Sequence, residues 1–352
     1  MQAGMTFDLR VKGALIAGAL SVTAVMSAVW AATAASTSPV SVRPQIAFTR
    51  IAPLAPSTDS LEIWVTNADG SGERLLTSRG DFNSWSPDGK KIAFTREHGS
   101  FNYEIYVMNA DGSSQRRLTR NDESDYFAAW SPDGSRIAFA SDRGSGEVWI
   151  MRADGSGARR LTSNVYCCTT WSPDGSQIAF LGKGVYVMNA DGTRKRRLAR
   201  DSASYAGPVW SPSGRQIAYL GPGDNIYVMN SDGSGKRRLT RTPVEDDRLA
   251  WSPDGRRIVF DRDVPGDYPS CDIFVTRVDG SGERRLTRTG ACARSAAWSP
   301  DGRRIAFTIE RRDYEAGIYV INADGTGQRT LTTGGGFGGD YAPAWRPRGN
   351  RR

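Results

Sequence analysis

Carboxylate side chains gather in the short segments that precede several tryptophans of this chain. Three of these segments read RNDESDYFAAW, PVEDDRLAW and GGGFGGDYAPAW. Their acids are Asp122, Glu123, Asp125, Glu245, Asp246, Asp247 and Asp340, and the aromatic residues Tyr126, Tyr166, Tyr205, Phe337 and Tyr341 stand in these or equivalent segments. Acids and aromatics of this kind can hold a protein or peptide. They can also bind Ca²⁺, or hydrolyse a glycosidic bond when two carboxylates such as Asp246 and Asp340 lie at a fixed distance.

Other catalytic chemistry finds little support in the residue types. His98 is the one histidine, and it lies in TREHGSFNYEIYV, where we expect an exposed loop between strands. A catalytic or metal-binding histidine needs convergent partners. There is no Gly-x-Ser-x-Gly elbow, and the many Asp-Gly pairs lack the full pattern of a calcium loop. The sequence therefore predicts no catalytic residue, no metal ligand and no cofactor, with Ca²⁺ kept as an alternative.

The elements that would position the acids come from a repeat. A tryptophan recurs at intervals between 39 residues (Trp171 to Trp210) and 47 residues (Trp251 to Trp298). The full set is Trp85, Trp130, Trp171, Trp210, Trp251, Trp298 and Trp345, each in WSP or, at the last, WRP. A residue that occupies the same place in every repeat is expected to pack between repeats rather than to bind a sugar or base.

Each repeat predicts four short antiparallel strands. Ser-Pro-Asp-Gly after the tryptophan suits a tight turn, and Ala-Asp-Gly or its equivalent supplies another between the third and fourth strands. Segments such as KIAF and IYVM alternate side chains between two faces, and both faces are apolar. A sheet of this kind must stack against copies of itself, and a period of about 40 to 45 residues is typical of a β-propeller.

The ends of the repeat region predict closure of this propeller. The first repeat begins at QIAF, residues 45–48, without a tryptophan strand, and the last tryptophan strand, in YAPAWRP, has no following IAF segment. We therefore expect an all-β, seven-bladed β-propeller of four-stranded antiparallel blades, in which the N- and C-terminal strands share one blade. Such sharing removes an open sheet edge.

These repeats resemble those of the TolB family of β-propellers. The resemblance rests on WSPDGKKIAFT, WSPDGSRIAFASDRGSGEVWIMRADG and their copies, and it extends from residue 45 to about residue 347. It implies a periplasmic interaction platform, related in fold to the propellers of prolyl oligopeptidase-type enzymes. TolB has an α/β domain before its propeller, whereas here only residues 35–44 separate the expected signal peptide from the first strand. The resemblance is therefore to a stand-alone propeller.

The repeat gives the predicted propeller two unlike faces. The turns after the first and third strands share one face, here called the turn face, and are nearly identical from repeat to repeat. The links after the second and fourth strands share the other, here called the variable face, and carry the acids and aromatics. Because binding residues concentrate on loops held by a rigid scaffold, we expect the ligand here, at the mouth of the central channel. The alternative is that these are merely solvated loops.

Arginine pairs open the predicted fourth strands. They are Arg116-Arg117, Arg159-Arg160, Arg196-Arg197, Arg237-Arg238 and Arg284-Arg285. If the fourth strand is outermost, the pairs form a basic rim that could contact an anionic cell wall or membrane surface. Charged protection of an exposed sheet edge is the favoured interpretation.

The four cysteines suit an exported protein. Cys271 and Cys292 both fall in variable-face links of neighbouring repeats, so a Cys271–Cys292 disulfide is the preferred pairing. Cys167 and Cys168 are adjacent and could pair with each other or stay free. Four cysteines allow three pairings, and the sequence alone leaves them open.

The N-terminus predicts export. Arg10 and Lys12 precede an uncharged run from residue 13 to residue 35 that ends in small residues. We expect a signal peptide over 1–34, or an uncleaved anchor, then a linker over 35–44, the propeller over 45–347 and a basic tail over 348–352. The chain of 352 residues carries a formal net charge of +8, but its exported location disfavours nucleic acid as a partner.

The sequence thus favours an exported, monomeric and non-catalytic scaffold that holds an envelope or extracellular protein or peptide. The expected ligand-binding residues are Asp122, Glu123, Asp125, Tyr126, Tyr205, Glu245, Asp246, Asp247, Phe337, Asp340 and Tyr341. The alternative is a carbohydrate- or metal-binding hydrolase or lyase that uses the same carboxylates.

Overall fold

The computed structural model describes residues 44–51, 61–99, 102–144, 146–165, 167–200, 206–265, 270–311, 315–334 and 339–348. Almost all regular structure in these ranges is β-strand, apart from the short 3₁₀ helix η3 (Pro222–Asp224). In the part of the chain that the structure describes, no helix is both long and apolar enough to cross a membrane.

Five sheets contain four antiparallel strands each. One has the order β28 (Asp340–Trp345), β1 (Gln45–Ile51), β2 (Leu61–Asn67) and β3 (Arg74–Thr77). The next contains β4 (Asp81–Trp85), β5 (Lys91–Glu97), β6 (Tyr103–Asn109) and β7 (Arg116–Arg117). The third contains β8 (Asp125–Trp130), β9 (Arg136–Ser141), β10 (Glu147–Arg152) and β11 (Arg159–Ser163). The fourth contains β12 (Cys167–Trp171), β13 (Gln177–Gly182), β14 (Gly184–Asn189) and β15 (Arg196–Ala199). The fifth contains β16 (Val209–Trp210), β17 (Gln216–Gly221), β18 (Asn225–Asn230) and β19 (Arg237–Arg238).

The remaining strands form one eight-stranded sheet. Its first half contains β20 (Asp246–Trp251), β21 (Arg257–Asp263), β22 (Cys271–Arg277) and β23 (Arg284–Arg285). Its second half contains β24 (Cys292–Trp298), β25 (Arg304–Glu310), β26 (Ala316–Asn322) and β27 (Arg329–Thr330). A single parallel residue pair, Cys271 with Cys292, joins the two halves. Each half therefore repeats the four-strand antiparallel unit of the other sheets.

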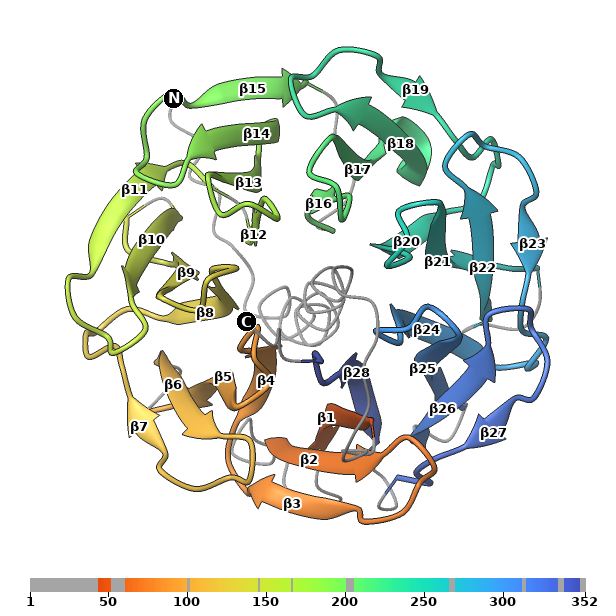
Figure 1. Cartoon of the computed structure of the whole chain (residues 1–352), viewed down its shortest axis with the longest axis horizontal. Coiled ribbons are helices and arrows are strands. Elements are labelled where there is room, and N and C mark those ends of the chain that lie inside the picture. The colour runs from red at the N-terminus through yellow and green to blue at the C-terminus, as the bar shows by residue number, and fades with distance from the viewer. Residues whose placement is uncertain are drawn as a thin grey trace, which may run out of the picture.

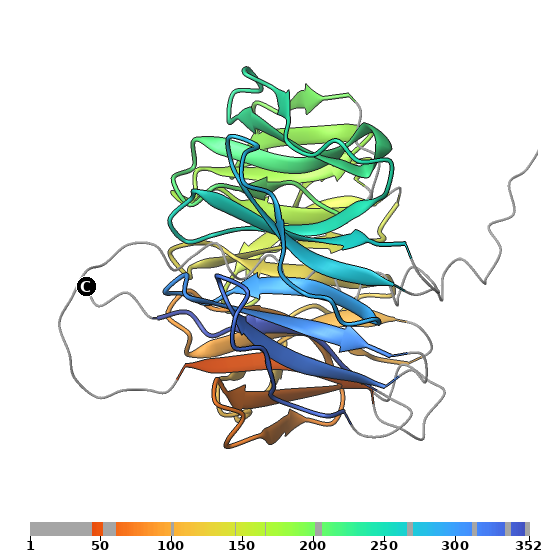
Figure 2. The same ribbon diagram turned by 90° about the vertical axis from the view of Figure 1, so that its right-hand side faces the viewer.

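The sheets are arranged around a common axis, as expected for a β-propeller (Figure 1). The tryptophan strands lie nearest the axis and the short arginine strands lie at the outside. Seen from the side, the strands run between the two faces of the molecule (Figure 2). Strand β28 pairs antiparallel with β1, so the two ends of the repeat region meet in one sheet.

The hydrophobic core lies between neighbouring sheets. One buried cluster combines Val107 of β6 with Phe139 of β9, and another combines Ile150 of β10 with Phe180 of β13. Both side-chain directions of a strand are used, because Ile92, Ala93 and Phe94 of β5 are all fully buried. The expectation that each sheet is apolar on both faces is confirmed, and this is why a single repeat cannot be stable alone.

The Ser-Pro-Asp-Gly segments form the predicted turns. In one of them the Ser131 hydroxyl donates to Asp133 Oδ1 at 2.5 Å, and the same oxygen accepts the Ser135 amide at 3.0 Å. Gly134 has a φ of 70°, in the left-handed region that favours glycine. The aspartate carboxylate thus satisfies the polar groups of the turn and holds the first two strands together.

Candidate functional site

The repeated tryptophans are structural. All seven are buried. Four of them donate from the indole Nε1 to a carbonyl oxygen of a neighbouring sheet: Trp85 to Ala344 (3.2 Å), Trp171 to Ala129 (3.1 Å), Trp251 to Val209 (3.0 Å) and Trp345 to Ala297 (3.0 Å). These side chains pack between sheets and are not available as platforms for a sugar or base.

The arginine pairs make contacts within the molecule. The first arginine of a pair donates to a carbonyl of the next sheet, as in Arg116 to Asp154 (2.8 Å), Arg159 to Asp191 (3.1 Å), Arg196 to Asp232 (3.0 Å) and Arg284 to Ala323 (3.1 Å). The second arginine contacts a buried acid at the start of the third strand, as in Arg117 with Glu104 (2.7 Å) and Arg160 with Glu147 (2.8 Å). The pairs therefore connect strands and sheets, which favours the structural interpretation over a rim that binds an anionic surface.

Three of the predicted ligand-binding acids are buried in ion pairs. Asp125, Asp246 and Asp340 are each at most 1% exposed. Asp125 pairs with Arg143 at 3.0 Å, Asp246 with Arg262 at 2.5 Å and Asp340 with Arg50 at 2.5 Å. The sequence predicts these acids at an open channel mouth. The structure instead uses them to attach the innermost strand to the second strand or to the link after it: Arg262 and Arg50 belong to second strands, and Arg143 follows one.

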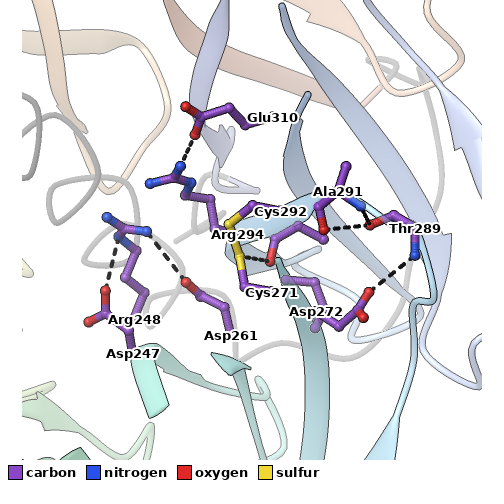
Figure 3. The surroundings of a disulfide bond; sticks show 12 residues. Asp247, Arg248, Asp261, Cys271, Asp272, Thr289, Ala291, Cys292, Arg294 and Glu310 are labelled. Atoms are coloured by element: carbon purple, nitrogen blue, oxygen red, sulfur yellow. Dashed lines mark hydrogen bonds and ion pairs between the residues drawn. A yellow bond between two sulfur atoms is a disulfide. The ribbon is translucent and has the colours of Figure 1, made fainter. Parts of the chain in front are cut away.

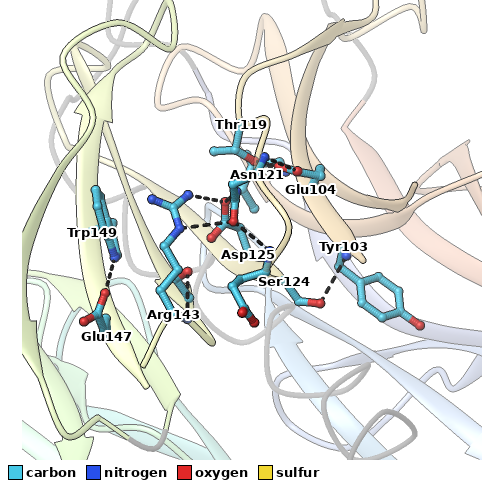
Figure 4. Close-up of polar contacts among 12 residues, drawn as sticks. Tyr103, Glu104, Thr119, Asn121, Ser124, Asp125, Arg143, Glu147 and Trp149 are labelled. Atoms are coloured by element: carbon cyan, nitrogen blue, oxygen red, sulfur yellow. Dashed lines mark hydrogen bonds and ion pairs between the residues drawn. The ribbon is translucent and has the colours of Figure 1, made fainter. Parts of the chain in front are cut away.

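The surroundings of Asp125 show how such an acid positions a loop (Figure 4). Its Oδ2 accepts Asn121 Nδ2 at 2.8 Å as well as Arg143 Nη2. The backbone amide of Asn121 donates to Glu104 Oε1 at 2.9 Å, and the side-chain Oδ1 of Asn121 accepts the backbone amide of Glu123 at 3.0 Å. Burial raises the pKa of Asp125 despite these donors. The network fixes the link that presents Asp122 and Glu123, both of which are exposed.

The other predicted residues have several environments. Glu245 is exposed, and Asp247 is half-buried. Tyr126 and Tyr341 are also half-buried, and burial raises the pKa of each phenol. The Tyr126 hydroxyl donates to Asp142. Tyr166, Tyr205 and Phe337 lie outside the described residues.

Two further acids of the variable face are not predicted from the sequence. Asp224 follows β17, and Asp263 ends β21. Burial raises the pKa of both, and the negative charges of Glu245 and Asp247 raise it further, so each of the two lies close enough to Glu245 and Asp247 to be repelled by them. Asp224 lies in the link after a second strand, and Asp263 is the last residue of one. The pattern of acids before each tryptophan does not include either residue.

A second charged cluster lies beside the disulfide (Figure 3). Arg248 of β20 contacts Asp261 of β21 at 3.4 Å and Asp247 at 3.6 Å. Arg294 of β24 pairs with Glu310 at the end of β25. None of these residues except Asp247 was identified from the sequence, because a β-bulge in each innermost strand decides which way its side chains point.

Two acids on the variable face, the buried Asp261 and the half-buried Asp81, have strongly shifted pKa values. Burial raises the pKa of Asp261 to about 8, partly offset by the nearby Arg248. Burial also raises the pKa of Asp81, at the start of β4, to about 7, partly offset by a hydrogen bond of 2.9 Å from the Thr49 hydroxyl. Both carboxyls can change protonation state near neutral pH, which is common at functional sites.

The predicted disulfide Cys271–Cys292 is present, with a Cα–Cα distance of 4.3 Å. It connects β22 to β24, and therefore joins two neighbouring repeats on the variable face. Cys168 is also disulfide-bonded. The side chain of Cys167 lies outside the described residues.

Histidine and metal chemistry gain no support from the described ranges. His98 is exposed, as expected, and its backbone amide donates to the Asn102 carbonyl at 2.6 Å. Among the residues that the structure describes, no group of three or more histidine, cysteine, aspartate or glutamate side chains could hold a metal ion.

Comparison with known proteins identifies the repeat. The model of the TolB beta propeller domain matches residues 50–184 and 221–351. No curated protein sequence matches this chain. Among solved structures, TolB from Acinetobacter baumannii is similar, with a TM-score of 0.54, 17% identity, and coverage of 82% of this chain and 79% of that one.

Two enzymes show the same fold. An oligogalacturonate lyase in complex with manganese matches with a TM-score of 0.60 and 13% identity, over 82% of this chain and 85% of that one. A puromycin-hydrolyzing peptidase from Mycobacterium tuberculosis matches with a TM-score of 0.62 and 13% identity, over 90% of this chain but 55% of that one. At these identities the likenesses establish the fold alone.

Proposed function

Because this chain belongs to the TolB β-propeller domain family, we propose that it is an exported, non-catalytic scaffold that holds a protein or peptide on its variable face. The family and the fold are compatible with both binding proteins and enzymes. The choice between them rests on how the acids of this chain are used.

The architecture that we propose for this scaffold is a closed ring of seven blades, monomeric, over residues 45–347. The four-stranded units and the pairing of β28 with β1 support it. Contacts between the first and last repeats support it as well, because Arg329 of β27 donates to the Ala68 carbonyl after β2. A closed ring would hold the loops of the variable face in fixed positions, which lowers the entropic cost of binding.

The observation that carries the proposal is the distribution of exposed acids. On the turn face, the aspartates are occupied by the hydroxyl and amide donors of their own turns, as at Asp111 and Asp133. On the variable face, Asp122, Glu123, Glu245 and Asp247 remain at least partly exposed on links that buried ion pairs hold in place. An ordered acidic surface of this kind is complementary to a basic protein or peptide segment.

Export is supported by the disulfide. Cys271–Cys292 is a bond of the kind that persists in oxidising compartments. We propose that residues 1–34 are the signal peptide or anchor, that 35–44 form a linker, and that the chain works in the periplasm, the cell envelope or the extracellular space. Residues 1–43 lie outside the described residues.

The enzyme alternative has less support. The carboxylate pair suggested for glycosidic chemistry, Asp246 and Asp340, is divided between two different arginines, Arg262 and Arg50. Both acids are buried, so neither carboxylate faces solvent where a sugar could reach it. No specific observation favours a hydrolase or lyase.

The test is capture of a partner from an envelope extract with three immobilised proteins. They are the native chain, a variable-face variant (Asp122→Asn, Glu123→Gln, Glu245→Gln, Asp247→Asn) and a turn-face variant (Asp111→Asn, Asp154→Asn, Asp191→Asn, Asp232→Asn). The two variants lose the same charge, and asparagine keeps the acceptor that each turn needs. We expect capture by the native and turn-face proteins and loss of capture by the variable-face variant. Equal capture by all three would contradict the proposal.

A further inference from the structure

Two arginines of neighbouring repeats come together beside the disulfide. Arg248 is the third residue of β20 and Arg294 is the third residue of β24. Each innermost strand has a bulge at this point, with a φ of 42° at Arg248 itself and 59° at Ser295, next to Arg294. A bulge redirects the side chains around it. In Figure 3 both guanidinium groups extend to the same side of the disulfide.

Arg248 is poorly partnered for a buried cation. Its side chain is 10% exposed, yet its two carboxylate contacts are long, 3.4 Å to Asp261 and 3.6 Å to Asp247. Its Nε has no hydrogen-bond acceptor among the described residues. Arg262, one strand away and similarly buried, differs sharply. It lies 2.5 Å from Asp246 and 2.6 Å from Glu283.

The negative charge around Arg248 is also reduced. Because burial raises the pKa of Asp261 to about 8, that carboxyl is mostly protonated at neutral pH. Asp247 is then the other carboxylate in contact, at 3.6 Å, and its side chain is 42% exposed. A buried guanidinium with five donors and one distant, solvated counterion is costly to maintain unless another anion binds it.

We propose that Arg248 and Arg294 bind the C-terminal carboxylate of a basic peptide or protein segment. Guanidinium groups bind a carboxylate through paired hydrogen bonds. The acids around the two arginines are the exposed Glu245 and Asp263 and the half-buried Asp247. They would repel a polyanion and attract a lysine or arginine side chain near the bound carboxylate. This inference rests on the proposed function and specifies the segment that the variable face recognises.

The test uses tetralysine with a free C-terminus and the same peptide with a C-terminal amide. Their binding to the full mature chain is measured by calorimetry at low salt. We expect the free acid to bind roughly tenfold more tightly than the amide, a difference typical of a charge-assisted pair. Arg248→Gln and Arg294→Gln should each remove most of this difference.

The matched control is Arg241→Gln, which removes an exposed arginine of the same variable-face link and should keep the difference. Arg248→Lys keeps the charge but not the paired hydrogen bonds, and a melting curve confirms that each variant is folded. Equal affinity for acid and amide, no binding of either, or tighter binding of digalacturonate than of the peptide would overturn the inference. The capture experiment separates this failure from failure of the proposed function. If the variable-face variant still loses capture, only the inference about the carboxylate is overturned. If the variant captures the partner as the native chain does, the proposed function fails as well.

Discussion

Two aspartates on opposite faces of the molecule have pKa values shifted in opposite directions. Asp111 lies in a turn between a third and a fourth strand, and Asp261 lies near the end of a second strand. Hydrogen bonds from the hydroxyl and amide of Ser113 lower the pKa of Asp111. Burial raises that of Asp261 to about 8.

The same contrast holds for further aspartates of the two faces. The pKa is lowered at the turn-face aspartates Asp88, Asp111, Asp133, Asp154, Asp174, Asp191, Asp232, Asp254, Asp279, Asp301 and Asp324. It is raised at the variable-face aspartates Asp81, Asp125, Asp224, Asp246, Asp261 and Asp263. The turn face uses its acids to stabilise turns. The variable face holds these six aspartates in environments that disfavour the charge, which is the condition in which a bound cation gains most.

The largest effect is expected from breaking a buried ion pair of the variable face. Arg262→Leu leaves Asp246 buried without its cation and should lower the free energy of unfolding by about 3–5 kcal/mol. Urea denaturation measures this loss. The control Arg256→Leu, at an exposed arginine of the turn face, should cost far less. Similar losses in the two variants would remove the distinction between the faces.

The next effect concerns the pH dependence of stability. Asp261 keeps its proton in the folded state up to pH about 8, whereas the unfolded chain releases it near its ordinary pKa of 3.8. Its contribution to stability therefore falls as the pH rises between these values, by at most about 1.4 kcal/mol per pH unit. Asp261→Asn removes this loss, so the variant should gain on the native chain as the pH rises from 4 to 8. Parallel stability curves for the two proteins would show that Asp261 is ionised in the fold.

A smaller effect with the opposite sign is expected on the turn face. At Asp133 burial tends to raise the pKa, but hydrogen bonds from Ser131 and Ser135 outweigh it and lower the pKa to about 2. The stability from this group is present above the ordinary pKa of 3.8 and is lost as the pH falls toward 2. Asp133→Ala should cost at most about 1 kcal/mol at pH 7 and less at pH 2. A cost that grows on acidification would contradict this sign.

The smallest effect is expected at an exposed turn acid whose acceptor is kept. Asp111→Asn retains an oxygen for the Ser113 amide, so the melting temperature at pH 7 should stay within error of the native value. Asp111→Ala removes the acceptor and should lower the melting temperature measurably. If Asn and Ala behaved alike, the charge rather than the hydrogen bond would be what the turn requires.

The repeated part of the fold could be predicted from the sequence because each repeat carries its own local signals. The tryptophans, the Ser-Pro-Asp-Gly turns and the alternating IAF segments gave the four-stranded unit, and the location of Cys271 and Cys292 in neighbouring links gave the disulfide. These features depend on residues that are close in sequence or repeated at a regular interval.

The candidate site was predicted only in part because its details depend on strand pairing. The sequence predicts Asp125, Asp246 and Asp340 as free acids, but each meets an arginine that lies in the neighbouring strand or directly after it. The bulges of the innermost strands are equally invisible, and they determine that Arg248 contacts Asp261. Composition identified the acidic face, whereas pairing register decided which of its acids are buried.

The measurement that tests the central claim most directly is hydrogen exchange of the native chain with and without its captured partner. The account predicts that binding slows exchange in the variable-face links around residues 120–125 and 241–247, and leaves the Ser-Pro-Asp-Gly and Ala-Asp-Gly turns unchanged. Protection confined to the turns would place the partner on the opposite face and contradict the account.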